Sequence, residues 1–296
     1  MSPGLRPFYK YSSPDGAVAM LESGSARYST PLLFNDPFDV QAGLHFDFDL
    51  AQLHRSVVDR IGELAEQRDK PQVDSQDVWG MVVLEAWRHF CTHGFDRERW
   101  MDLTASSFAS LLEVIRETQA DYQKHWHEIQ LPQMRVFCVS EERDSLLMWA
   151  HYAKDHTGAV LELWSLPEED NPLSVAVPVN YVERPIAFYS LKEFVDDMVG
   201  IQKLDIRSLY RRYACTKSVH WAYEKEWRVW YPLSKTQKYD FSPIRPNELK
   251  AIYLGCRSEK SFRDKVQRLV AEKFPKTRIL IASRASGAYA LEYTDA

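Results

Sequence analysis

The chain has 296 residues, of which 45% are apolar and 27% charged. It is therefore long enough to bury a large core, as one big domain or as a domain with a sizeable insertion. The net charge of −5 and the pI near 6.0 exclude an overall basic field of the kind that gathers nucleic acids, so nucleic-acid binding would have to rest on a local basic patch.

The first 40 residues predict two strands, a helix and a tight turn. A strand at 5–11 carries Lys10 among aromatic rings, and a helix at 14–22 has Ser12 or Ser13 as its cap. A second strand is expected at 26–30. The turn at 35–39 is rich in Asn, Asp and Pro, whose properties favour tight turns. We interpret it as a rigid corner that can also hold a binding loop in place.

Charged and apolar residues recur at helical spacing between residues 46 and 134, which predicts a helical insertion between strands. His125 and His127 lie in this region at the spacing of a possible metal pair. A helix, however, does not place residues i and i+2 on one face, and no carboxylate–histidine signature follows. We therefore assign no metal ligands here.

The middle of the chain predicts a strand, a helix and a second strand, at 135–140, 141–153 and 158–164. Ser140 or Asp144 is expected to cap the helix. His151 lies on this helix, and the sequence allows two interpretations of it. It is either a hydrogen-bonded structural residue or a catalytic base.

The remaining segments complete the predicted fold. Residues 174–189 alternate like further strand, and residues 191–213 predict one long amphipathic helix. The cations at the end of this helix either face a phosphate group or stabilise the helix C-terminus; they are Arg207, Arg211, Arg212 and Lys217. A strand at 251–255, a helix at 259–274 and strands at 277–282 and 288–293 follow. We therefore predict a single α+β domain over residues 1–296, with a mainly antiparallel sheet, flanking helices and 46–134 as a helical insertion.

The stretch 218–231 combines aromatic rings with charged groups and is the most informative part of the sequence. In a strand that begins at Glu224, side chains alternate, so Glu224, Glu226 and Arg228 share one face. Two carboxylates this close repel each other and need a shared proton or a neighbouring cation, and Arg228 is the nearest one in the sequence. The set is either a structural ion-pair ladder or part of a catalytic site.

Several motifs together resemble a widespread bacterial family known as a domain of unknown function. They are FYKY at 8–11, FNDPFD at 34–39, Ser140, LMWAHYA at 147–153 with Gly158, WAYEKEWR at 221–228 and IYLG at 252–255. The resemblance covers nearly the whole chain apart from the helical insertion. It implies a stand-alone bacterial protein of a kind associated with accessory or defence genes, and it carries no established activity.

The order of certain residues is also similar to that of arginine-type ADP-ribosyltransferases. This resemblance implies that Lys10 or Arg27 holds the phosphates of NAD, that Ser29 and Thr30 support the site, and that Glu224 and Glu226 form its Glu-x-Glu motif. The second glutamate would bond a ribose hydroxyl and stabilise oxocarbenium-like charge, while the first would align the acceptor. Aromatic rings would stack on the nicotinamide; the candidates are Tyr28, Trp221 and Tyr223. Pro31 stands where the family has a third serine.

The resulting candidate site has three groups of residues. The catalytic candidates are Glu224, Glu226 and His151. The cofactor-binding candidates are Lys10, Arg27, Tyr28, Ser29, Asn35, Asp36, Tyr223 and Arg228. We expect an NAD-dependent ADP-ribosyltransferase-like enzyme that acts as a toxin or defence effector on a nucleotide, with an acceptor that the sequence does not name.

Two other classes of function stay open. A metal-dependent nuclease or phosphodiesterase would use carboxylates as Mg²⁺ ligands, with Arg228 or Lys225 near the phosphate; the ligands would be Asp36, Asp39, Glu224 and Glu226. A non-catalytic ligand- or partner-binding module would keep His151, Glu224 and Arg228 as a structural network.

The cysteines and the hydropathy pattern predict the cellular location. Four cysteines are far apart and form no CxxC pair, which argues against a structural zinc site and for reduced thiols. No apolar run reaches the roughly 18 residues of a membrane span, and residues 1–7 lack the apolar core of a signal peptide. We expect a cytoplasmic protein with no membrane partner.

Overall fold

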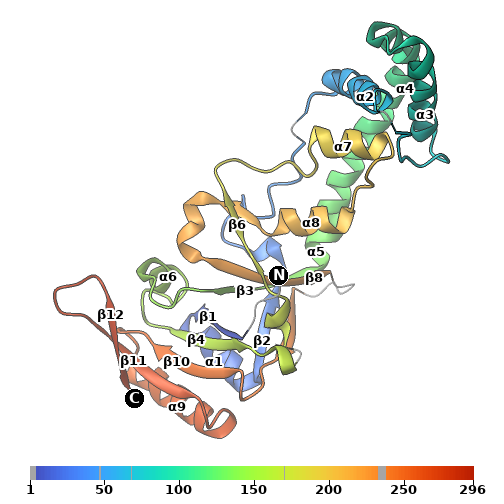
Figure 1. The fold of residues 1–296 in the computed structure, drawn as a ribbon. Helices are drawn as coiled ribbons and strands as arrows, with labels where there is room; N and C mark the ends of the chain where they lie inside the picture. The colour runs from blue at the N-terminus through green and yellow to red at the C-terminus, as the bar shows by residue number, and fades with distance from the viewer. Residues whose placement is uncertain (1–4, 47, 68, 170, 233–237) are drawn as a thin grey trace. The chain divides into compact units, whose positions relative to one another are not determined.

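The computed structural model describes residues 5–46, 48–67, 69–169, 171–232 and 238–296, and its fold is α+β, as predicted (Figure 1). The first four residues, part of the segment that bears on a signal peptide, lie outside this description. The chain divides into two compact units. Unit 1 comprises Met1–Ala42, Ile129–Arg184 and Cys215–Ala296, and unit 2 comprises Gly43–Glu128 and Pro185–Ala214.

Unit 1 is built on a mostly antiparallel sheet, which confirms the predicted pairing. The main path of the sheet has the order β12-β11-β10-β4-β1-β3-β2-β9, and β8 pairs with both β3 and β5. β10 and β11 are parallel, and a separate parallel pair joins β6 to β7. The strands are β1 Arg6–Ser12, β2 Ser25–Ser29, β3 Met134–Ser140, β4 Ala159–Ser165, β5 Val177–Pro178, β6 Asn180–Val182, β7 Thr216–Ser218, β8 Glu226–Pro232, β9 Tyr239–Pro243, β10 Leu249–Leu254, β11 Arg278–Arg284 and β12 Leu291–Asp295.

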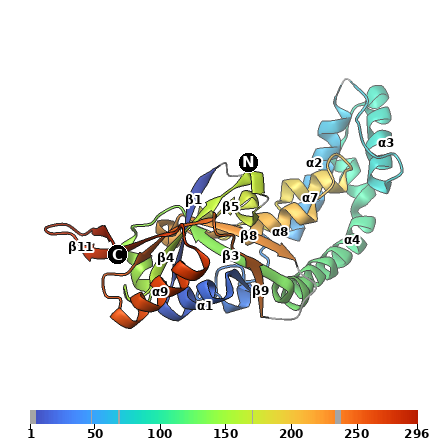
Figure 2. The ribbon, with the colours of Figure 1, turned by 90° about the horizontal axis from the view of Figure 1, so that it is seen from below.

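Two helices of unit 1, α1 Pro14–Ser23 and α9 Lys260–Lys273, lie on the same side of this sheet (Figure 2). Their apolar side chains join one core with the strands, including Leu21 from α1, Val266 from α9 and Phe8 from β1. Ser13 caps α1 by accepting a hydrogen bond from the Gly16 amide. The other helical segments of unit 1 are short: η1 Pro31–Leu33, α5 Leu131–Gln133, α6 Leu146–His151, η3 Pro167–Glu169, η4 Pro172–Val175 and η5 Val219–Glu224.

The way in which β1 and β2 pair with β3 positions the site. β3 pairs with β1 at Ser140, opposite Tyr9, but with β2 at Val136, opposite Ser29. β1 and β2 therefore meet β3 near its opposite ends, while β8 pairs with β3 from Met134 to Ser140. Because side chains alternate along a strand, one side of β2 carries Ala26 and Tyr28 into the core, while Ser25, Arg27 and Ser29 take the other side.

Unit 2 is helical. It contains α2 Leu50–Ala65, α3 Val78–His93, α4 Arg97–His125, α7 Leu191–Met198 and α8 Ile206–Ala214, and a π-helical segment, Trp126–Gln130, follows α4. Its core joins Leu53 and Ile61 of α2, Val83 of α3 and Phe108 of α4 with Val195 of α7. Helices from 46–134 thus pack in one unit with helices from a later segment.

Two predicted helices are shorter than expected. The helix predicted at 191–213 is wrong as a single element: α7 and α8 are separate, and Gly200 after α7 has a φ of +76°, a left-handed conformation that glycine adopts readily. The helix predicted at 141–153 is α6 alone. Ser145 caps it by accepting a hydrogen bond from the Met148 amide, so neither Ser140 nor Asp144 is the cap.

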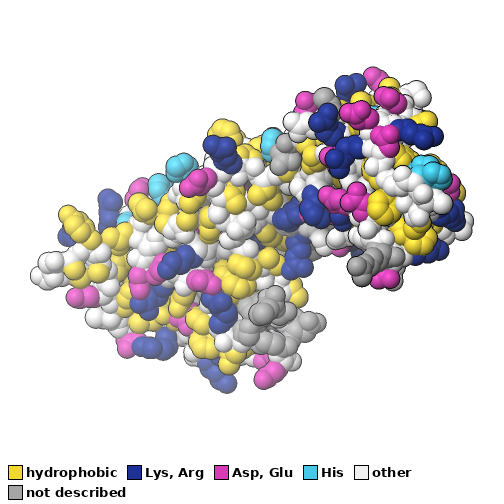
Figure 3. All heavy atoms as spheres, turned by 45° about the horizontal axis from the view of Figure 1, so that its top comes forward, with side chains coloured by type: hydrophobic (Ala, Val, Ile, Leu, Met, Phe, Trp, Pro, Cys, Tyr) yellow, Lys and Arg dark blue, Asp and Glu magenta, His cyan; other side chains and the backbone are white. Residues whose placement is uncertain are grey.

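On the face drawn in Figure 3, Lys and Arg side chains are interspersed with Asp and Glu. Among the described residues, none of the helices has both the length and the apolar character needed to cross a bilayer.

Candidate functional site

A cavity of about 460 Å³ lies in unit 1, beside β3. β1, β2 and β3 line it, together with α1, α6, β7, η5, β8 and β9 and the turn after η1. Seven of the predicted site residues line it: Lys10, Arg27, Ser29, Asn35, His151, Glu224 and Glu226. Residues from widely separated parts of the sequence thus meet around one hollow.

The two glutamates reach this cavity from different kinds of backbone. Glu224 ends the 3-10 helix η5, Lys225 adopts a left-handed conformation with φ 42°, and β8 begins only at Glu226. The prediction that a strand begins at Glu224 is therefore wrong, because the left-handed residue turns the chain before pairing with β3 begins. Ser140 fixes this turn, since its hydroxyl donates a 2.6 Å hydrogen bond to the Glu224 carbonyl.

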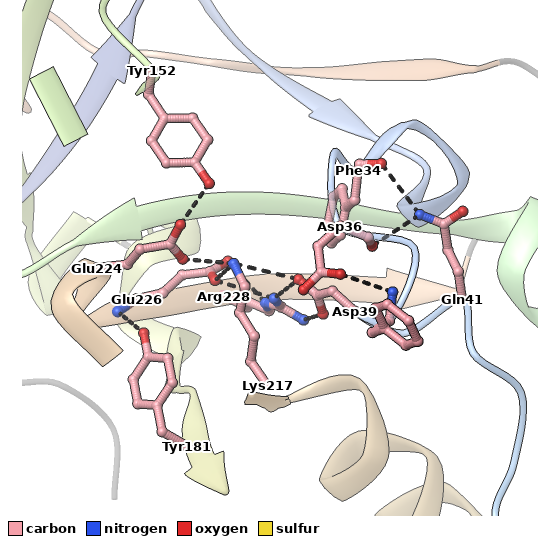
Figure 4. A network of polar contacts seen from close by, with 11 residues as sticks. Phe34, Asp36, Asp39, Gln41, Tyr152, Tyr181, Lys217, Glu224, Glu226 and Arg228 are labelled. Carbon is pink, nitrogen blue, oxygen red and sulfur yellow. Dashed lines mark hydrogen bonds and ion pairs between the residues drawn. The ribbon is translucent and has the colours of Figure 1, made fainter. Parts of the chain in front are cut away.

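Lys217 lies between the two glutamates (Figure 4). Its Nζ atom is 2.6 Å from Oε2 of Glu224, 3.2 Å from Oε2 of Glu226 and 3.5 Å from Oδ2 of Asp39. The sequence placed Lys217 in a cation cluster with the arginines of α8. Instead, β7 carries it into the site in unit 1, while Arg211 and Arg212 belong to unit 2.

Arg228 holds the other side of the same cluster (Figure 4). Its NH1 and NH2 atoms donate to the two Asp39 oxygens at 3.0 and 2.6 Å, and its Nε donates to Oε1 of Glu226 at 2.9 Å. Arg228 thus lies beside a carboxylate, as the sequence indicated, but it is fully buried and does not line the cavity. Its observed contacts place it in the supporting network of the site.

The cluster combines three buried carboxylates, of Asp39, Glu224 and Glu226, with two buried cations, Lys217 and Arg228. Burial raises the pKa of Glu226, but the attraction of Arg228 and Lys217 outweighs burial, so this pKa lies well below its ordinary value. Burial also raises the pKa of Glu224, and although Lys217 opposes this effect, the pKa of Glu224 stays above its ordinary value. The environments of the two glutamates therefore separate their affinities for a proton.

Tyr152 is a functional candidate that the sequence analysis did not select. Its hydroxyl donates a 2.5 Å hydrogen bond to Oε1 of Glu224, and its ring lines the cavity (Figure 4). His151, the neighbouring residue that the sequence favoured, is exposed at the end of α6 and also lines the cavity. The motif that contains both residues was a signal for this site, but only the helix orientation shows which one reaches a carboxylate.

The lining of the cavity includes two further cations, Lys10 and Arg27. Lys10 donates a 2.8 Å hydrogen bond to the Cys138 carbonyl, and its Nζ lies 5.0 Å from the centre of the Phe137 ring. The guanidinium carbon of Arg27 lies 4.6 Å from the centre of the Tyr239 ring. Ser29, two residues after Arg27, also lines the cavity. The cavity is therefore lined by cations outside the Lys217–Arg228 cluster as well as by carboxylates.

Besides Arg228, three predicted cofactor-binding residues do not line the cavity. Tyr28 packs in the core, with its ring 5.2 Å from that of Phe137, because alternation along β2 turns it away from the cavity. Asp36 accepts a 2.9 Å hydrogen bond from the Phe38 amide and so holds the turn. Tyr223 packs beside Trp221 and against a core cluster that includes Tyr11 and Met148. The assignments of Tyr28, Asp36 and Tyr223 to ligand contacts are corrected accordingly.

The predicted Mg²⁺ ligands are engaged with other groups. Asp36 accepts a hydrogen bond within its own turn. The carboxylates of Asp39, Glu224 and Glu226 contact Lys217 or Arg228. A divalent ion would have to displace the Lys217 ammonium from among them. Within the described parts of the chain, no set of three or more His, Cys, Asp or Glu side chains is arranged to hold a metal ion.

Comparisons with known proteins give one match. A search of curated proteins and a search of solved structures both find no match to this chain. Residues 148–229 match the model of a family described as "Protein of unknown function (DUF2971)". The matched segment includes Tyr152, Lys217, both glutamates and Arg228. This match confirms the expected domain-of-unknown-function family.

Proposed function

We propose that unit 1 is an enzyme that binds NAD in the cavity and cleaves its nicotinamide–ribose bond, as an ADP-ribosyltransferase-like enzyme does. One observation carries this proposal: Arg27 and Ser29 from β2 line the same cavity as Glu224 and Glu226, so that cationic and acidic side chains share its lining. These residues are far apart in the sequence and were selected together by the resemblance in motif order.

The charges of NAD match this arrangement. Its nicotinamide ring is cationic and its diphosphate is anionic, so a cavity lined by both acidic and cationic side chains can bind both groups. Arg27 would face the diphosphate, since it lines the cavity and its guanidinium stacks on an aromatic ring. The nicotinamide ribose would then lie beside Glu224 and Glu226.

The proposed chemistry is heterolysis of the glycosidic bond. The bond between ribose C1′ and the pyridinium nitrogen breaks, nicotinamide leaves with the electron pair as a neutral molecule, and positive charge develops on the ribosyl group. The buried cluster has three carboxylates and two cations, so one negative charge remains to stabilise that group. An acceptor O–H or N–H then bonds to C1′ and passes its proton to Glu224, whose raised pKa suits a base.

A non-catalytic ligand-binding module is the second candidate, and a specific observation favours it. Arg228 and Lys217 already occupy hydrogen-bonding positions on Glu226, as expected of a structural ion cluster. The metal-dependent nuclease or phosphodiesterase has less support, because the Lys217 ammonium lies where a divalent ion would have to bind.

The decisive experiment is incubation of the purified protein with NAD labelled in the adenosine half, with and without bacterial lysate. The expected result is release of nicotinamide and transfer of label to an acceptor or to water. Glu226→Gln should abolish both, whereas Glu272→Gln, at an exposed position of α9, should not. If the protein binds NAD and releases no nicotinamide with any acceptor, the binding module is favoured. If it neither binds nor cleaves NAD, the proposal is rejected.

A further inference from the structure

Two lysines line the cavity, and their surroundings are opposite. Lys217 has three carboxylates within 3.5 Å of its Nζ atom. Lys10 instead donates one hydrogen bond to a backbone carbonyl and forms no ion pair with a carboxylate among the described residues. The same cavity therefore holds one lysine whose charge is well compensated and one whose charge is not.

The groups that act on Lys10 come from several elements. β3 supplies the Cys138 carbonyl and the Phe137 ring. β2 supplies Arg27, a like charge that disfavours the ammonium form. β8 supplies Glu226, whose opposite charge acts on Lys10 more strongly than Arg27 does, and η5 supplies Glu224, whose effect is weaker. Cys138 contributes a thiol that is buried and held protonated, since burial raises its pKa well above the ordinary value. No side chain in this set neutralises Lys10 as Asp39, Glu224 and Glu226 neutralise Lys217.

These surroundings shift the pKa of each lysine amine in opposite directions. Burial lowers the pKa of Lys10, and the opposite charges, including those of Glu226 and Glu224, only partly oppose this effect. Burial acts in the same direction on Lys217, but its carboxylates outweigh burial and raise its pKa. A desolvated lysine beside another cation is the usual setting of a nucleophilic amine, because more of it is unprotonated near neutral pH.

We propose that Lys10 forms an imine with the carbonyl carbon of an anionic aldehyde or ketone bound in the cavity, and that Arg27 holds the anionic group of that ligand. In this step the lone pair of the neutral Nζ attacks the carbonyl carbon, a C–N bond forms, and the carbonyl oxygen leaves as water with the two amine protons. The ligand needs an anionic group because Arg27 lines the same cavity and pairs with no carboxylate of the described chain. This inference is independent of the proposed NAD chemistry.

Pyridoxal phosphate is a suitable probe because it carries an aldehyde and a phosphate. The intact protein is incubated with it at pH 7, the imine is reduced with borohydride, and labelled peptides are identified by mass spectrometry. Lys10 should be labelled severalfold faster than the exposed Lys260, because more of Lys10 is unprotonated at pH 7. Lys217, in the same cavity, is the internal control and should stay unlabelled.

Two comparisons complete the test. Arg27→Met removes a like charge and should slow labelling of Lys10 by both probes, but by pyridoxal phosphate more than by pyridoxal, which lacks the phosphate. The rate at Lys10 should also level off at a lower pH than the rate at Lys260. The proposal is overturned if Lys260 reacts as fast as Lys10 or faster, if both lysines share one pH dependence, or if Arg27→Met slows both probes equally.

Discussion

The Nζ atom of Lys217 lies 2.6 Å from Oε2 of Glu224, and this contact ties β7 to the end of η5 in a region where both side chains are buried. The same ammonium also reaches Glu226, so one lysine links both acids of the Glu-x-Glu motif. A buried lysine in this position stabilises two carboxylates that would otherwise repel each other. The acidic lining of the cavity therefore depends on a residue outside the motif.

Lys217→Met should lower the free energy of unfolding by about 3–5 kcal/mol, the usual cost of removing one partner from a buried ion pair. The loss arises because Glu224 keeps its buried position without its cation. Urea denaturation followed by circular dichroism measures the change. The control is Lys260→Met, at a side chain that is 81% exposed, and it should stay within about 0.5 kcal/mol of the unmodified protein. Equal stability of the two variants would contradict the role of Lys217.

Glu226→Gln should reduce stability more at neutral pH than in acid. The folded-state pKa of Glu226 is lowered from its ordinary 4.5, so the carboxylate stabilises the fold above that pH and loses this contribution as the pH falls through the folded pKa. The difference in unfolding free energy between the variant and the unmodified protein should therefore shrink between pH 6 and pH 3. Urea titrations across this range measure it, and a constant difference would contradict the prediction.

Tyr152→Phe should lower stability and raise the pKa of Glu224 without removing a charge. The variant loses one hydrogen bond to a carboxylate, which contributes about 1.5–3 kcal/mol to stability. Because that hydrogen bond favours the ionised form, its loss raises the pKa of Glu224 further. If Glu224 acts as a base, the acidic limb of the pH profile of nicotinamide release should move to higher pH. Tyr289→Phe, at a fully exposed position, serves as the control, and matching profiles for the two variants would argue against Glu224 as the base.

Gly200→Ala should destabilise unit 2 by about 1–2 kcal/mol, because an alanine at φ +76° places its Cβ in the strained left-handed region. Gly200→Asn should cost less, since asparagine tolerates this conformation. Thermal unfolding of the two variants compares the costs. Equal losses would mean that contacts of the new side chain, rather than backbone strain, set the effect.

Local patterns in the sequence determined much of the secondary structure. The cap at Ser13, the turn held by Asp36 and the alternation along β2 all depend on residues a few positions apart. The α+β class and the antiparallel pairing also followed from the order of such segments. The break between α7 and α8 was missed because amphipathic spacing continues across Gly200, although the glycine itself was a visible signal.

The composition of the site was only partly predictable from the sequence. Glu224, Glu226 and Arg228 were selected because they lie close together in the chain and carry opposite charges. The sequence predicts that Lys217 clusters with the arginines of the preceding helix, and it predicts Asp39 only as a turn residue or a metal ligand. Their places in the cluster depend on how β7 and the turn after η1 pack against β8, and no local pattern encodes that packing.

Tertiary structure alone decided which side chains face the cavity and how each is charged. Tyr28 and Arg27 are adjacent in the sequence, yet Tyr28 packs in the core and Arg27 lines the cavity. His151 and Tyr152 are also adjacent, and Tyr152 is the one that donates a hydrogen bond to the Glu224 carboxylate. Lys10 and Lys217 have the same chemistry in isolation, yet burial beside a backbone carbonyl lowers the pKa of one and three carboxylates raise that of the other. The sequence names the ionisable groups, but the field at each group depends on distances that exist only after the strands have paired.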